Sequence, residues 1–168
     1  MAIEPIAKPR GVWCVHASKR TGCGVYASRP SACASFRCLW LDGQTPAHWK
    51  PSVSKMVLHQ LEQTIVVDVD PGTPNAWRAP QYYNEIKQWS ERALTGSAGG
   101  SWRVLVSVGD TVWAIFPPED LLLGEIDANV PVEVGVHDGD GWFQPFARIY
   151  RQGVYSEVHG QRWTRQPA

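Results

Sequence analysis

Residues 80–95, with the sequence PQYYNEIKQWSERALT, decide the fold class because they hold the clearest periodic pattern in the chain. Their apolar residues recur at spacings of four, three and four: Tyr82, Ile86, Trp89 and Ala93. Apolar residues at this spacing form a stripe along one face of an α-helix. Gly96 follows as a typical helix end, so the sequence predicts one main helix over residues 80–95.

Runs rich in β-branched and aromatic residues lie on both sides of this helix and predict strands. The expected strands are residues 55–60, 64–70, 102–108, 111–116, 130–136, 142–150 and 154–159. The first run also fits a short helix. Gly109-Asp110 and the Asp-Gly repeat at residues 138–141 are typical hairpin turns. Strands around a single helix predict an α+β fold with a mainly antiparallel sheet.

The 168 residues have the length of one domain. We expect two parts that form one compact unit. Residues 1–43 are an irregular, Cys-rich, metal-binding segment without a lasting helix or strand period, and residues 44–168 are an α+β body. The irregular segment is expected to pack on the sheet of the body.

Charge and hydropathy exclude several classes of protein. The 16 basic residues balance 16 acidic ones, which argues against a nucleic acid as the main ligand. No apolar run approaches the roughly 20 residues of a membrane helix. Residues 1–10 contain an early acid, two prolines and no apolar stretch, unlike a signal peptide. We therefore expect a soluble cytoplasmic protein without a membrane partner.

All four cysteines lie in the first quarter of the chain: Cys14, Cys23, Cys33 and Cys38. In a reducing compartment, such residues are more often thiols or metal ligands than disulfides. Four thiolates fill the tetrahedral shell of a structural zinc ion, and they can also hold an iron–sulfur cluster. The clustering favours a metal site over four buried structural cysteines. His16 could replace one thiolate as a nitrogen ligand.

Charges are unevenly distributed along the chain. Residues 1–41 carry six basic groups and one acid, whereas residues 104–147 carry eight acids and no Lys or Arg. The two regions could face each other. The basic residues near the cysteines, such as Arg29 and Arg37, would also offset the negative charge of a tetrathiolate site.

The residues around the last three cysteines, GCGVYASRPSACASFRC at 22–38, resemble the signature of the YkgJ-like cysteine-cluster family, described as zinc- or iron-chelating proteins. The matching positions are Cys23, Tyr26, Arg29, Pro30, Cys33, Phe36 and Cys38. The resemblance implies that the three matching cysteines are metal ligands, with Cys14 as the fourth by its position. Ala34 departs from the family's usual Arg, and Cys14 stands alone where the family has closely spaced cysteines.

These observations predict a small metal-binding protein whose four-cysteine site holds structural zinc and whose role is binding or scaffolding. The alternative is an iron–sulfur or thiol redox protein that uses the same cysteines. An enzyme is less expected, because the sequence contains no phosphate-binding loop and no nucleophile–base pair. Asp68 and Asp70 are interpreted as the solvated face of an edge strand. No partner can be assigned to His48, His59 or His159.

Overall fold

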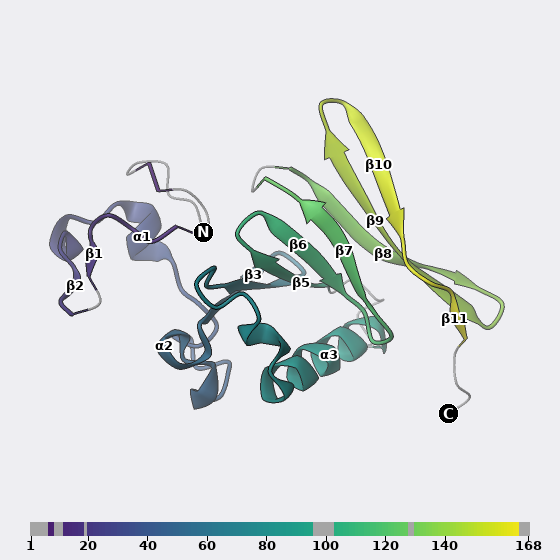
Figure 1. Ribbon diagram of the computed structural model, residues 1–168, viewed down its shortest axis with the longest axis horizontal. Coiled ribbons are helices and arrows are strands. Elements are labelled where there is room, and N and C mark those ends of the chain that lie inside the picture. The colour runs from purple at the N-terminus through teal and green to yellow at the C-terminus, as the bar shows by residue number, and fades with distance from the viewer. Residues whose placement is uncertain (1–6, 9–11, 19, 96–102, 128–129, 165–168) are drawn as a thin grey trace.

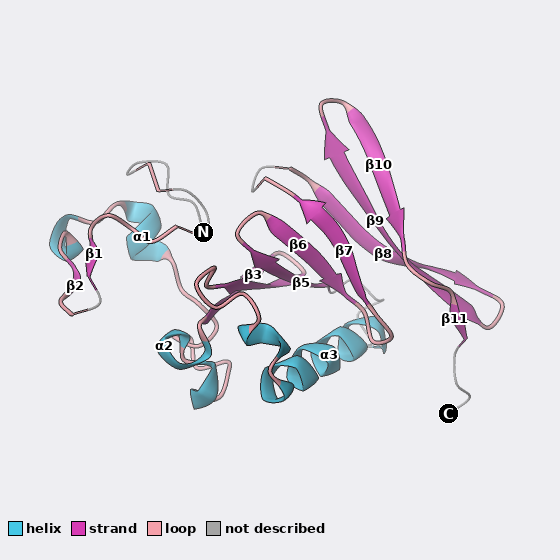
Figure 2. Ribbon diagram, in the orientation of Figure 1, coloured by secondary structure: helices cyan, strands magenta, loops and turns pink. Residues whose placement is uncertain are grey.

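The computed structural model describes residues 7–8, 12–18, 20–95, 103–127 and 130–164. Two larger β-sheets and one long helix form the body, and a group of short elements lies at one side of it (Figures 1 and 2). The α+β class and the mainly antiparallel pairing are confirmed, but the strands of the body divide into two sheets. Gly96 and residue 102, which we assigned to a helix end and a strand, lie outside the described residues.

The first sheet has five strands in the order β3-β4-β5-β6-β7. They span Met56–Leu61, Thr64–Val69, Arg103–Val108, Thr111–Ile115 and Asp120–Glu125, respectively. Neighbours are antiparallel except for β4 and β5, which pair in parallel. Helix α3 (Pro80–Thr95) explains this exception, because a parallel pair needs a long crossover connection and α3 lies between the two strands in the chain.

Helix α3 covers one face of the first sheet with the predicted apolar stripe. Tyr82 and Ile86 are buried, and the ring of Trp89 lies 5.0 Å from that of Trp49. The buried members of this first core are Trp49, Met56, Leu58, Val67, Val69, Trp77, Tyr82, Ile86, Val104, Val106 and Ile115. Removal of these side chains from water is the main favourable contribution to the stability of this layer.

The second sheet is built around the long strand β9 (Trp142–Arg151). β8 (Val132–Gly139) pairs with one side of β9. β10 (Val154–His159) and the two-residue β11 (Trp163–Thr164) pair with successive parts of its other side. One face of this sheet packs against the first sheet. The resulting second core consists of Val112, Ala114, Phe116, Leu121, Leu123, Ile126, Val134, Ala147 and Ile149.

Short elements occupy the N-terminal part of the chain and the connections of the body. They are β1 (Ala17–Ser18), β2 (Gly22–Cys23), η2 (Tyr26–Ser28), α1 (Ser31–Ser35), η3 (Ala47–Trp49), α2 (Pro51–Ser54) and η4 (Ala76–Arg78). Figure 1 shows β1, β2 and α1 beyond the edge strand β3, away from the two sheets. Within the described residues, no helix is both long enough and apolar enough to cross a membrane.

Candidate metal centres

The first two cysteines of the expected zinc site lie at one small hairpin: Cys23 ends its second strand, β2, and Cys14 precedes its first strand, β1. β1 and β2 place Ala17 opposite Cys23, and the Gly24 N–H donates to the carbonyl oxygen of His16 at 2.8 Å. The Ala17 N–H also donates to the Cys14 carbonyl oxygen at 2.9 Å, which closes a turn at the start of the hairpin. The backbone therefore brings the neighbourhoods of Cys14 and Cys23 together.

The Arg-Pro step between Cys23 and Cys33 has the local geometry expected for it. Proline restricts the residue before it to extended conformations, and Arg29 has φ −61° and ψ 145°. The Arg29 guanidinium lies 3.8 Å from the centre of the Tyr26 ring and donates to the Tyr26 carbonyl oxygen at 2.8 Å. The Pro30 carbonyl oxygen then accepts the Cys33 N–H at 2.9 Å, at the start of α1. These contacts link residues of the family signature to one another.

Cys38 lies where the segment joins the body. It is buried, and the N–H of the next residue, Leu39, donates to the Leu58 carbonyl oxygen in β3 at 2.8 Å. The ring of Phe36 meets the ring of His59 in an edge-on contact, with centroids 6.0 Å apart. The expected packing of the Cys-rich segment on the body is thus seen in the stretch from Phe36 to Trp40, where Leu39 and Trp40 pack against the first core.

The four thiols are free and differ in exposure. Cys38 is buried, Cys14 and Cys33 are half-buried, and Cys23 is exposed. They do not form a cluster. Among the described residues, three metal-ligating side chains with ligand atoms within 4.8 Å of one another are found on the second sheet and include no cysteine. The structure therefore brings the hairpin cysteines into one region without assembling a four-sulfur site, and His16 does not complete one.

The described residues from 12 to 37 of the Cys-rich segment form no core of their own. Of the described residues between 12 and 37, none is buried. Its large apolar side chains are instead exposed, including Trp13 at 59%, Val15 at 86% and Tyr26 at 65% of their surface. A segment of this kind gains little stability from hydrophobic burial, and proteins commonly stabilise such segments with disulfides or a metal ion.

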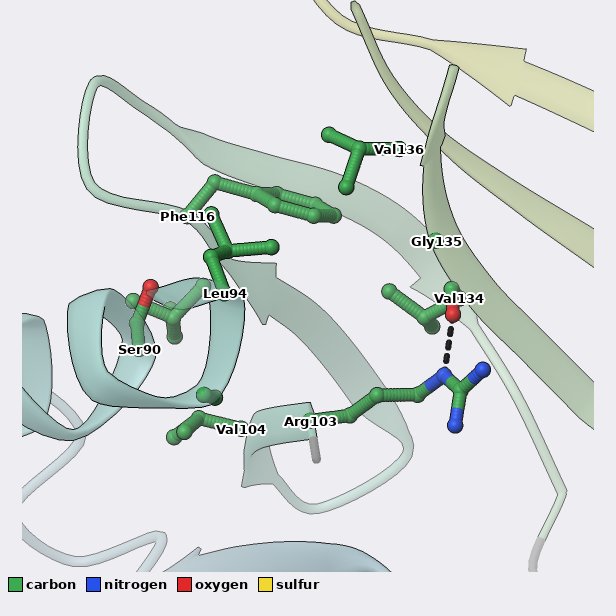
Figure 3. Close-up of a pocket in the computed structure, with 10 residues that line it drawn as sticks. Ser90, Leu94, Arg103, Val104, Phe116, Val134, Gly135 and Val136 are labelled. Carbon is green, nitrogen blue, oxygen red and sulfur yellow. Dashed lines mark hydrogen bonds between the residues drawn. The ribbon is translucent and has the colours of Figure 1, made fainter. Parts of the chain in front are cut away.

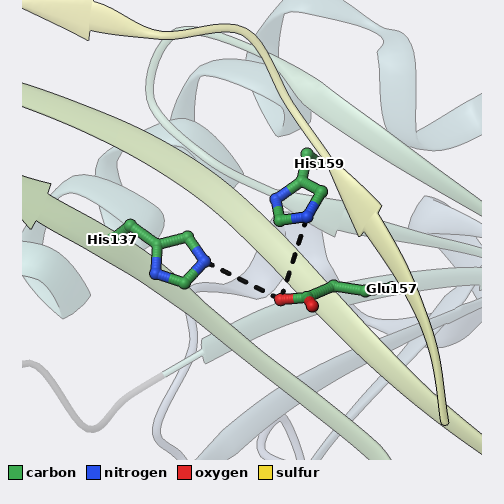
Figure 4. Close-up of side chains that lie close together, drawn as sticks. All are labelled: His137, Glu157 and His159. Atoms are coloured by element: carbon green, nitrogen blue, oxygen red, sulfur yellow. Dashed lines mark ion pairs between the residues drawn. The ribbon is translucent and has the colours of Figure 1, made fainter.

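The assembled group of ligands consists of His137 on β8 with Glu157 and His159 on β10 (Figure 4). Glu157 Oε1 lies 3.7 Å from His137 Nε2 and 3.9 Å from His159 Nε2. Sequence reasoning missed this group because it placed His137 beside a hairpin turn and left His159 unassigned. The only local signal is the spacing of Glu157 and His159, which alternation places on one face of a strand.

The remaining histidines of the body have structural partners. His48 Nε2 lies 2.6 Å from Glu85 Oε1, and His59 Nε2 lies 2.9 Å from Asp68 Oδ2. The Ser107 hydroxyl donates to the other oxygen of Asp68 at 2.5 Å. Nucleophilic catalysis would need the histidine between the serine and the acid. Here the acid lies between the other two, so this chain of hydrogen bonds is not a catalytic triad.

Asp68 differs from its sequence interpretation. Strand β4 lies between β3 and β5 and is not an edge strand, and the Asp68 side chain is only 17% exposed. Burial by itself would raise the pKa of Asp68, but the pKa lies well below its usual range, and the hydrogen bonds from His59 and Ser107 are among the causes that lower it. Asp68 is therefore an ionised, structural carboxylate.

A cavity of about 20 Å³ lies between α3, the first sheet and β8 (Figure 3). The buried Ser90 hydroxyl lines it and has no hydrogen-bond partner among the described residues. The Arg103 side chain, on the opposite wall, donates to the Val134 carbonyl oxygen. The volume suits a single water molecule and is far below that of a ligand pocket, so this cavity is not a substrate site.

Comparison with known proteins adds no relative: no protein-family model, curated protein or solved structure matches the chain. The resemblance to the YkgJ-like family therefore rests on the motif at residues 22–38 alone.

Proposed function

We propose that the chain is a metal-binding protein in which Cys14, Cys23, Cys33 and Cys38 hold one zinc ion. The observation that carries this proposal is the N-terminal segment itself. Three of the four thiols lie between residues 12 and 37, where no described side chain is buried, and the fourth, the buried Cys38, follows directly. The ion would supply the stabilisation that a hydrophobic core supplies elsewhere.

Binding of a structural zinc ion is coupled to folding. In zinc-finger peptides it contributes roughly 10–16 kcal/mol at neutral pH, far more than the few exposed contacts of this segment. Cys23 lies in β2 and Cys14 in the turn before β1. Cys33 and Cys38 would join them when η2, α1 and the following residues close around the ion. Closure on metal binding is therefore part of the proposed function.

The charges of the segment support a thiolate site. Zinc with four thiolates carries a net charge of −2, and residues 5–41 contain no Asp or Glu. Arg20 and Arg29 lie in this stretch and are positive at neutral pH, whereas Arg37 pairs with Asp42. The family resemblance, which implies Cys23, Cys33 and Cys38 as ligands, agrees with this assignment.

The role that we propose for the zinc ion is structural. The proposed role of the protein is to bind or scaffold a partner and not to catalyse a reaction. Four thiolates leave no coordination position for a substrate. An iron–sulfur cluster on the same cysteines is the alternative, and the colour of the purified protein distinguishes the two.

The test is elemental analysis, a visible spectrum and thiol titration of full-length protein purified without oxygen and without added metal. Zinc, a colourless solution, and thiols that react only after chelation would support the proposal. Iron, sulfide and a broad visible band would replace it with the iron–sulfur alternative. Four thiols that react at once with or without chelator would contradict both.

A matched pair of variants assigns the metal to the cysteines. Cys33→Ser removes one sulfur from α1, and we expect it to expose the other three thiols to reaction without chelator. Ala34→Ser places the same serine on the next, exposed position of α1 and should leave the thiols protected. Equal protection in both variants would remove Cys33 from the site.

A further inference from the structure

We propose that His137, Glu157 and His159 form a second metal site, which binds a divalent transition-metal ion of the zinc type and leaves coordination positions open to solvent. The site lies on the second sheet and shares no residue with the Cys-rich segment (Figures 1 and 4). It therefore stands or falls independently of the zinc site proposed above.

The spacing of the three ligand atoms is close to that of an occupied site. Zinc bonds to nitrogen and oxygen are about 2.1 Å long, so neighbouring ligands of a tetrahedral ion lie about 3.4 Å apart. The two His–Glu separations are 3.7 and 3.9 Å, and all three atoms lie within 4.8 Å of one another. Small side-chain rotations would bring Glu157 and each histidine to the separation that two ligands of one zinc ion have.

The register of the sheet explains why residues on two different strands meet. His137 is paired with Gln144 of β9, and His159 is paired with Phe146, two residues further along the same strand. Both histidines therefore rise from the same face of the sheet, on opposite sides of β9. Glu157 precedes His159 by two residues and shares that face.

Phe146 forms an apolar floor beneath the site. It is buried, with 8% of its surface exposed, and its ring stacks on the His137 ring at 4.4 Å, with an angle of 28° between the planes. Gly135 makes room for it, because a Cβ at this position would come within 2.8 Å of the Phe146 ring. Rigid strands and a packed aromatic floor preorganise the ligands, as metal sites require.

Charged neighbours hold the carboxylate in place. Arg148 Nε lies 3.4 Å from Glu157 Oε1, and Arg148 Nη1 lies 3.4 Å from Glu133 Oε2. Outer partners of this kind orient the ligands of metal sites. Glu157 and Glu133 carry two negative charges against the one positive charge of Arg148, so the net local charge is negative and favours a cation.

The donor set specifies the class of ion. Two imidazoles and one carboxylate are the protein ligands of several catalytic zinc sites and of non-haem iron(II) sites, which both keep positions for water or substrate. The side chains of His137 and His159 are 41% and 44% exposed, so an ion and an exchangeable ligand can reach the group from solvent. Hard cations that prefer an all-oxygen shell are disfavoured.

The test is a zinc titration of the full-length protein after its thiol-bound metal has been loaded. Long-range nitrogen–proton NMR follows each imidazole, and calorimetry follows the affinity. We expect the resonances of His137 and His159 to shift together with one further equivalent of zinc. His159→Ala should weaken that equivalent at least about tenfold while leaving the cysteine thiols protected, because the two sites share no ligand.

The control is His48→Gln, because His48 and Glu85 form a His–carboxylate pair without a third ligand in the described residues. This variant should bind the further equivalent like the parent protein. Imidazole resonances of His137 and His159 that stay unchanged at millimolar zinc would overturn the proposal and leave the group as an ion pair. Equal affinity in the parent protein and His159→Ala would do the same.

Discussion

Asp120 shows how a single carboxylate joins the helix to the first sheet. Its side chain is 10% exposed, and it lies 2.7 Å from Lys87 Nζ and 3.2 Å from Arg78 Nη1. The Tyr83 hydroxyl donates to it at 3.0 Å. Burial and this acceptor both raise the pKa of Tyr83. Asp120 thus pairs with two cations at the start of β7.

Replacement of this carboxylate should destabilise the protein, because Asp120→Asn leaves Lys87 and Arg78 without their counter-charge. We expect the free energy of unfolding to fall by about 2–3 kcal/mol, measured by urea denaturation. Asp42→Asn is the control, because Asp42 pairs with Arg37 at the surface, where an ion pair contributes at most about 1 kcal/mol. Equal losses in the two variants would show that burial of the Asp120 cluster is unimportant.

Asp68 gives the folded state a dependence on acid. Its pKa is lowered on folding by His59 and Ser107 despite burial, so its stabilising contribution is complete above the unfolded-state pKa of about 4. As the pH falls from there toward the folded-state pKa, the unfolded chain binds a proton first. Stability should then decrease by up to about 1.4 kcal/mol per pH unit.

Urea denaturation of the parent protein and Asp68→Asn between about pH 5 and pH 2, a range set by the unfolded-state pKa of about 4, measures this effect. The parent protein should lose stability more steeply than the variant. Asp140→Asn, in an exposed turn outside the network, should follow the parent curve. Parallel curves for the parent protein and Asp68→Asn would contradict the lowered pKa.

At the scale of elements, helix α3 is the part of the fold that local sequence determines best. Ile86 is fully buried between α3 and the sheet, and Ile86→Ala should cost about 2–4 kcal/mol in unfolding free energy. Glu91→Ala, on the exposed side of the same helix, should change it by less than about 0.5 kcal/mol. A loss at Glu91 as large as that at Ile86 would contradict the assigned helix face in the same denaturation experiment.

Elements that depend on local patterns were predicted correctly, and those that depend on distant pairing were not. The helix and the hairpins at Gly109 and at residues 138–141 match the structure. Strand β7 was missed because the run Leu121-Leu122-Leu123 does not alternate, and the β6–β7 pairing contains a register shift. The ambiguous run at 55–60 is strand β3, whose pairing with β4 decides against a helix.

The candidate sites divide in the same way. The cysteines stood out because their clustering is visible along the chain, although their assembly into one site stays a prediction. His137, Glu157 and His159 could not be found from sequence, because only the registers β8–β9 and β9–β10 place them together. A parallel pair between β4 and β5 was likewise hidden, since the pairing follows from the crossover of α3 and not from either strand alone.

At the scale of the whole molecule, stability is distributed unevenly. The body has two hydrophobic cores that share the first sheet, one beneath α3 and one between the sheets. The segment from residue 12 to residue 37 contributes no described side chain to either core. Regions with few buried contacts open at a lower free energy than the core. Removal of metal should therefore loosen this segment while the two-sheet body remains folded.

Limited trypsin digestion measures this difference, because Arg20 and Arg37 lie within the segment and neither is followed by proline. Addition of a chelator should accelerate cleavage at these arginines at least about tenfold, since a tenfold change needs only about 1.4 kcal/mol of lost local stability. Arg148, within the central strand β9, should remain protected and serves as the internal control. Added zinc should restore the slow cleavage. Cleavage at Arg20 that is fast with and without zinc would show that no metal stabilises the segment. Simultaneous cleavage at Arg148 would show that the ion stabilises the whole chain.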